Sequence, residues 1–110
     1  MKISVHGFYQ PQAVELGLNH DDLLVLRWFV DCIGTGRMPA VNLDGEDFYL
    51  VDFSVMLADL PVLNITQQTL RRSRFRNLCR SGILTRATVN GTLTFFACGV
   101  NYGSLVGGVK

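Results

Sequence analysis

The fold is decided by residues 66–98, TQQTLRRSRFRNLCRSGILTRATVNGTLTFFAC. The first half of this stretch predicts a helix that runs to about residue 81, because Gly82 provides a stop signal. Two residues are alternative N-caps for this helix. Asn64 has capping-box spacing to Gln67, and Thr66 is the competing cap.

The second half of the stretch predicts a β-hairpin. Strand-forming residues 83–89 and 92–98 flank Asn90-Gly91, which is the strongest short signal for a two-residue hairpin turn. A smaller hairpin is expected upstream, over residues 40–51, because Asp44-Gly45 is a turn signal of the same kind.

Two further helices are expected before residue 66. Residues 19–33 are apolar on nearly all sides of a helix, which indicates a central, buried element. Residues 52–60 predict a second helix, because their apolar side chains repeat at helical spacing and Pro61 stops the repeat.

The predicted order of elements is helix, small hairpin, helix, helix, hairpin, which defines a mainly helical α+β fold. A helix-turn-helix followed at once by a two-stranded hairpin is the layout of a winged helix. We therefore expect a winged helix-turn-helix with a C-terminal β-hairpin wing and a small second hairpin. The 110-residue length suits one domain, which we place at residues 1–105, with a flexible tail at residues 106–110.

The composition excludes several classes of protein. Hydrophobic residues make up 48% of the chain and charged residues 17%, which excludes an intrinsically disordered protein. The apolar runs are too short to span a membrane, and the chain does not open on a secretory leader, so we expect a cytoplasmic protein. The three cysteines have neither zinc spacing nor the pattern of a disulfide framework.

The charges are divided unequally along the chain. All nine acidic residues lie within residues 1–60, whereas residues 61–110 hold seven Lys and Arg and no acid. Such asymmetry is typical of a protein half that faces a polyanion. The alternative is that the two halves neutralise each other in the folded protein.

The helix expected at residues 66–81 has one apolar side and one arginine-rich side when it is drawn with 100° per residue. Arginine beside small hydroxyl and amide side chains suits the major groove of DNA, where guanidinium groups bind guanine edges or phosphate oxygens. Arg71 and Arg74 fall on the apolar side, so we expect their aliphatic stems to cover the edge of the core. The expected base-reading residues are Gln67, Gln68, Thr69, Arg72, Ser73 and Arg76, and the expected phosphate contacts are Arg80 and Arg86.

No pattern in the sequence indicates catalysis, a metal site or a cofactor. His6 and His20 are the only histidines, and neither has a Cys, Asp or Glu at ligand spacing. No Ser or Cys has a base with an orienting acid at a recognisable spacing. We therefore do not expect an enzyme.

Several segments, taken together in their order and spacing, resemble the N-terminal domain of bacteriophage replisome organisers, which are replication-initiation proteins of phages of Gram-positive hosts. The resemblance covers about residues 7–105. It departs from the family at Arg74, where the family has a leucine, while an apolar residue, Phe75, follows at the next position here. The helix register could therefore be shifted by one residue at this point. The segments are Gly7-Phe8-Tyr9-Gln10-Pro11, Glu15-Leu16-Gly17-Leu18, residues 21–31, Asp59-Leu60-Pro61, Thr69-Leu70-Arg71-Arg72, Gly82-Ile83-Leu84 and Asn101-Tyr102-Gly103-Ser104-Leu105.

The resemblance implies a winged-helix domain that binds repeats at a phage origin, with host replication or helicase-loading proteins as partners. We accordingly expect a sequence-specific module for double-stranded DNA that acts through the helix at 66–81 and the wing at 83–98. Two alternatives stay open: a stand-alone phage transcriptional regulator, and a winged-helix protein that binds and inhibits a host nucleic-acid enzyme. A homodimer also stays open.

Overall fold

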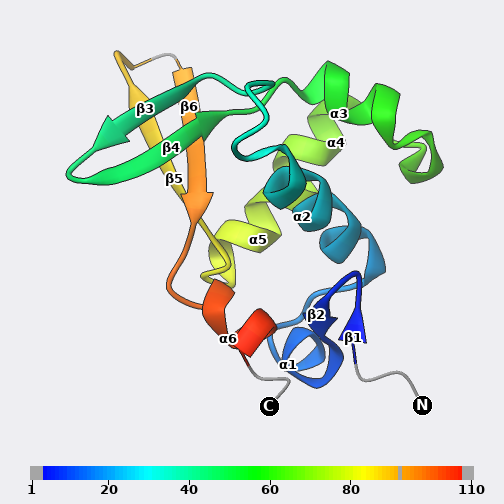
Figure 1. The fold of residues 1–110 in the computed structure, drawn as a ribbon. Helices are drawn as coiled ribbons and strands as arrows, with labels where there is room; N and C mark the ends of the chain where they lie inside the picture. The colour runs from blue at the N-terminus through cyan, green and yellow to red at the C-terminus, as the bar shows by residue number, and fades with distance from the viewer. Residues whose placement is uncertain (1–3, 92, 108–110) are drawn as a thin grey trace.

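The computed structural model describes residues 4–91 and 93–107 and has an α+β fold, as the sequence predicts. The helices gather on one side of a four-stranded sheet, and α2 lies at their centre (Figure 1). The elements in chain order are β1 (Ser4–Val5), β2 (Phe8–Tyr9), α1 (Gln10–Glu15), α2 (His20–Cys32), β3 (Ala40–Leu43), β4 (Glu46–Leu50), α3 (Phe53–Asp59), the 3₁₀ turn η1 (Pro61–Leu63), α4 (Gln67–Thr69), the π-helix η2 (Leu70–Phe75), α5 (Arg76–Arg80), β5 (Leu84–Val89), β6 (Leu93–Cys98) and α6 (Tyr102–Gly107).

The two predicted hairpins form one antiparallel sheet with the strand order β3-β4-β6-β5. They are joined where β4 pairs with β6, which places Tyr49 opposite Phe96. The turns Asp44-Gly45 and Asn90-Gly91 have φ angles between 53° and 85°, as a two-residue turn with positive φ at both positions requires. The prediction of both turns is confirmed, whereas Thr92, the expected first residue of the last strand, lies outside the described residues.

Helix α2 is the centre of the core, as its apolar sequence predicts. Seven of its thirteen residues are buried, and a capping box starts it, in which the side chains of Asn19 and Asp22 each accept a hydrogen bond from the other's backbone N–H. At its other end, the Trp28 indole N–H donates to Asp59 over 2.8 Å and links α2 to α3. This bond and the neighbouring Arg37 guanidinium hold the pKa of the Asp59 carboxyl below its usual value.

The predicted third helix occupies residues 67–80, and Thr66 is its N-cap. The Thr66 hydroxyl oxygen accepts from the Thr69 backbone N–H over 3.1 Å. Asn64, the alternative cap, instead has left-handed backbone with a φ of 50°, so the capping box expected with Gln67 does not form. Gly82, with a φ of 81°, follows the last turn and ends the helix as expected.

The middle of this helix is not regular, because residues 70–75 form a π-helix. With 100° per residue, Leu70 and Phe75 would lie 140° apart around the axis. Hydrogen bonds from i to i+5 widen the turn and bring residues five apart onto one side. Both side chains are in fact buried, at 0% and 1% exposure, so the register shifts by one residue within this turn.

The C-terminal segment continues the fold further than expected. Residues 106 and 107, which the sequence placed in a flexible tail, lie in α6, and Leu105 is fully buried. The Asn101 side chain donates to the Ser81 carbonyl oxygen over 2.8 Å, which fastens the segment before α6 to the end of the 67–80 helix. Within residues 4–91 and 93–107, none of the helices is both long enough and apolar enough to cross a membrane.

Candidate nucleic-acid interface

Three exposed arginines, Arg72, Arg76 and Arg80, follow one another at four-residue intervals along the 67–80 helix. All three line two different hollows of the surface, one on each side of the helix. We call these three side chains the arginine ridge. The larger hollow has a volume of about 1140 Å³ and the smaller one of about 420 Å³.

The larger hollow, which we call the arginine groove, lies between the helix and the C-terminal hairpin β5–β6. Besides the ridge, Arg71 and Arg86 line it, and no carboxylate of the described residues does. Arg86 lies opposite Phe96 in the strand register, so the sheet presents it on the same face as Phe96 and toward the helix. Buried Phe75, Leu84 and Phe96 contribute apolar walls.

The arginines of the groove are little neutralised. Within residues 4–91 and 93–107, Arg72, Arg76 and Arg86 have neither an ion pair nor a hydrogen bond. Arg80 donates to the Asn77 side-chain oxygen over 2.6 Å, and the Arg71 guanidinium lies 5.3 Å from the centre of the Phe53 ring. Five positive charges around one hollow repel one another and favour an anionic ligand.

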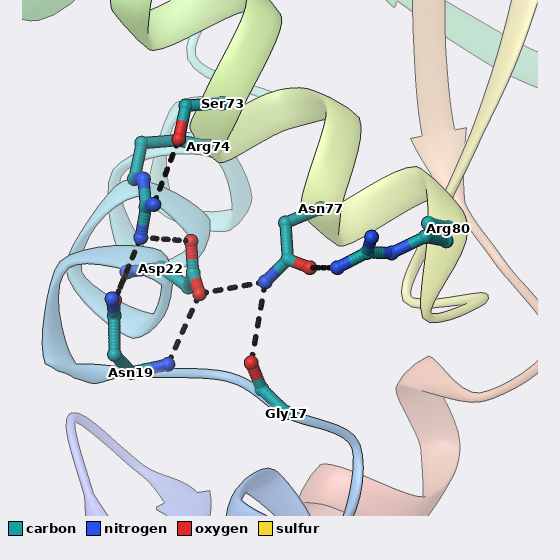
Figure 2. Close-up of polar contacts among 7 residues, drawn as sticks. All are labelled: Gly17, Asn19, Asp22, Ser73, Arg74, Asn77 and Arg80. Carbon is teal, nitrogen blue, oxygen red and sulfur yellow. Dashed lines mark hydrogen bonds and ion pairs between the residues drawn. The ribbon is translucent and has the colours of Figure 1, made fainter.

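Arg74 is different, because its charge is neutralised inside the protein. One Nη atom of Arg74 donates to the carboxylate of Asp22 and to the side-chain oxygen of Asn19, in each case over 2.9 Å (Figure 2). These contacts involve only the guanidinium group, so the expected covering of the core edge by the Arg74 stem stays a prediction. The open alternative was that the two halves of the chain neutralise each other. Among the described arginines of the C-terminal half, this holds for Arg74 alone.

Asp22 is the partner that the sequence did not reveal. Its side chain is 1% exposed, and it accepts hydrogen bonds from the Asn19 backbone, from Arg74 and from the Asn77 amide at 2.9 Å (Figure 2). A buried carboxylate needs such partners, since burial without them carries a large desolvation cost. The charge of Arg74 on the apolar side of the predicted helix was the available signal, but nothing local pointed to a residue 52 positions away.

The structure separates the expected site residues into three places. Arg72, Arg76, Arg80 and Arg86 surround the groove. Ser73 lines the smaller hollow, half-buried, and its hydroxyl oxygen accepts from Arg74 over 2.8 Å. Exposed residues of the first helical turn line neither hollow; they are Gln67, Gln68 and Thr69.

The remaining titratable groups near the site do not add negative charge to the groove. Burial raises the pKa of the Cys79 thiol, and the Arg86 guanidinium opposes this without reversing it, so the thiol is neutral at pH 7. Elsewhere, the fold brings the Nε2 atoms of His6 and His20 to 2.9 Å, a proximity that their spacing did not suggest. No cluster of three or more potential metal ligands exists among the residues that the structure describes.

None of the known family models, curated proteins or solved structures matches the chain significantly.

Proposed function

We propose that this chain is a DNA-binding module that places the 67–80 helix in the major groove of double-stranded DNA. An α-helix with its side chains is about 10–12 Å wide, which fits a major groove about 12 Å wide. The β5–β6 hairpin lies beside the helix and contacts the flanking backbone through Arg86.

The arginine groove is the observation that carries the proposal. Its five arginines have no carboxylate partner among the described residues, so their charge is available to phosphate oxygens. Guanidinium groups bind phosphates and guanine edges in a bidentate manner, and a row of them along one helix follows the path of a nucleic-acid backbone.

The order of elements supports a winged helix as the frame of this site. Helix α2 is followed by the β3–β4 hairpin, then by α3 and the 67–80 helix, and then by β5–β6, with β4 pairing to β6. The short η1 connection after α3 supports a helix-turn-helix, in which the second helix enters the major groove.

The target of the module is proposed from the resemblance to phage replisome organisers. It favours an origin of replication as the DNA, host helicase-loading proteins as further partners, and the cytoplasm of a bacterial host as the location. A promoter as the target instead of an origin would make the protein a transcriptional regulator with the same DNA-contacting residues.

Selection of binding sites from a random DNA library with the purified protein tests the proposal. We expect enrichment of one motif, and its loss with the double variant Arg72→Ala/Arg76→Ala while the circular dichroism spectrum stays that of the wild type. A library that is not enriched, together with no retention of duplex at low salt, would overturn the proposal. Occurrence of the motif at a promoter and not in an origin array would support the regulator.

A further inference from the structure

Asp22 holds the 67–80 helix at the point where its geometry changes. The π-helix ends at Phe75, and Asp22 binds Arg74 on one side of that point and Asn77 on the other (Figure 2). Asn77 also donates to the Gly17 carbonyl oxygen over 3.3 Å, so the same contacts fasten the helix to the loop before α2.

The turn decides how the arginines align. Each residue of register corresponds to a rotation of 100°, so a shift at residues 70–75 would turn Arg72 relative to Arg76 and Arg80. Regular spacing would place Leu70, Arg74 and Leu78 on one side of the helix, since residues i and i+4 lie above one another. Because of the π-helix, Phe75 and not Arg74 packs in the core. Asp22 then neutralises the charge of Arg74.

We propose that Asp22 is the positioning residue of the arginine ridge. Through its contacts with Arg74 and Asn77, it fixes the rotation of the helix about its axis and so the direction in which the ridge points. It also neutralises the charge of Arg74, which therefore does not bind DNA. This inference rests on the proposed DNA-binding function. Asp22 itself does not touch the nucleic acid.

The test uses Asp22→Asn, which keeps one oxygen for the cap of α2 and replaces the oxygen that accepts from Arg74 with an NH2 donor, so that the charge and the acceptor for Arg74 are removed together. Binding is measured by fluorescence anisotropy, as a function of salt, on a random 20-base-pair duplex and on the duplex from site selection. Three proteins are compared with the wild type: Asp22→Asn, Arg74→Gln and Asp22→Asn/Arg74→Gln.

We expect Asp22→Asn to lower the ratio of specific to random affinity about tenfold, the scale of one lost base contact. Its log–log salt slope on random duplex should steepen by about 0.9, because the released Arg74 gains a phosphate. The double variant should return the slope to the wild-type value, and Arg74→Gln alone should leave it there. Partial unfolding would lower both affinities equally, so the ratio and the slope distinguish positioning from a loss of stability.

Two results would overturn the inference while leaving the proposed function intact. Arg74→Gln could flatten the slope by about 0.9, which would make Arg74 a direct phosphate contact. Alternatively, Asp22→Asn could leave both the ratio and the slope unchanged. Wild-type protein that binds neither duplex at low salt would overturn the proposed function and this inference with it.

Discussion

The salt dependence of DNA binding is a quantity that the structure lets us calculate. Five arginines line the groove, and each phosphate that they neutralise contributes about −0.9 to the slope of log affinity against log salt. We therefore expect a slope of about −4.5 on duplex of random sequence, where all five bind phosphates instead of bases. Between 50 and 200 mM salt, this slope corresponds to a loss of affinity of roughly 500-fold.

Arg76→Ala removes one of these charges from the middle of the ridge. The slope should then fall to about −3.6, and the loss of affinity over the same range of salt to about 150-fold. Arg76 is exposed and has no partner in the described part of the chain, so its loss should leave the free energy of unfolding within about 0.5 kcal/mol of the wild-type value.

Fluorescence anisotropy of a labelled 20-base-pair duplex, titrated at four salt concentrations, measures both slopes. Arg37→Gln is the matched control, because it also removes one arginine charge but lies outside the groove, where Arg37 is paired with Asp59 over 2.7 Å. A wild-type slope near zero, or an Arg76→Ala slope equal to that of the wild type, would refute the reasoning.

Three further predictions concern the fold that carries the site. Phe75→Ala should cost about 3–5 kcal/mol in the free energy of unfolding measured with urea, and a loss below about 1 kcal/mol would contradict its place in the core. The Trp28 hydrogen bond lowers the pKa of Asp59 below its usual 3.8, so the charged carboxylate stabilises the fold above that pH, and the stabilisation is lost as the pH falls through the lower, folded-state pKa. Asp59→Asn should therefore show a flatter decline of the thermal midpoint below about pH 4, and a decline parallel to that of the wild type would exclude this contribution. Gly99→Ala should lower the thermal midpoint by about 5 °C or more, because its Cβ would press on the Gly82 carbonyl oxygen, and an unchanged midpoint would disprove that close approach.

Local signals predicted the elements of this fold well. The turns at Asp44-Gly45 and Asn90-Gly91 depend only on the backbone preference of the residues within them. The cap at Thr66 likewise involves a bond between residues three apart, although sequence alone did not exclude Asn64. The pairing of β4 with β6 escaped prediction, because it joins segments that are more than 40 residues apart.

The irregular part of the arginine helix escaped prediction for a different reason. A five-residue spacing places Leu70 and Phe75 140° apart in a regular helix, and a helical drawing with a constant step accommodates this by widening the apolar side. In that drawing Arg74 falls on the apolar side, where no partner for its charge can be seen. Arg74 is charged because it pairs with Asp22. From the sequence alone, Asp22 has a different explanation, since an acidic residue in the first turn of a helix is favourable by itself.

The candidate site was predictable in part. The absence of acidic residues from the 67–80 helix indicated that its arginines have no local partners, and the free guanidinium groups of Arg72 and Arg76 agree with this. The groove itself was not predictable, because Arg86 reaches it from β5 through the register of the sheet. Gln67, Gln68 and Thr69 stay predictions, since they lie at the first turn and outside both hollows.

Mapping of the DNA-contacting surface by nuclear magnetic resonance tests the central claim most directly. Unlabelled 20-base-pair duplex is titrated into ¹⁵N-labelled protein at low salt, and the shifts of backbone and arginine side-chain resonances are followed. The account predicts that the largest shifts fall on residues 67–80 and on the strand that carries Arg86, while the Arg74 side chain shifts little. Shifts confined to the opposite face of the sheet, around Phe48 and Phe95, or no shifts at all, would contradict it.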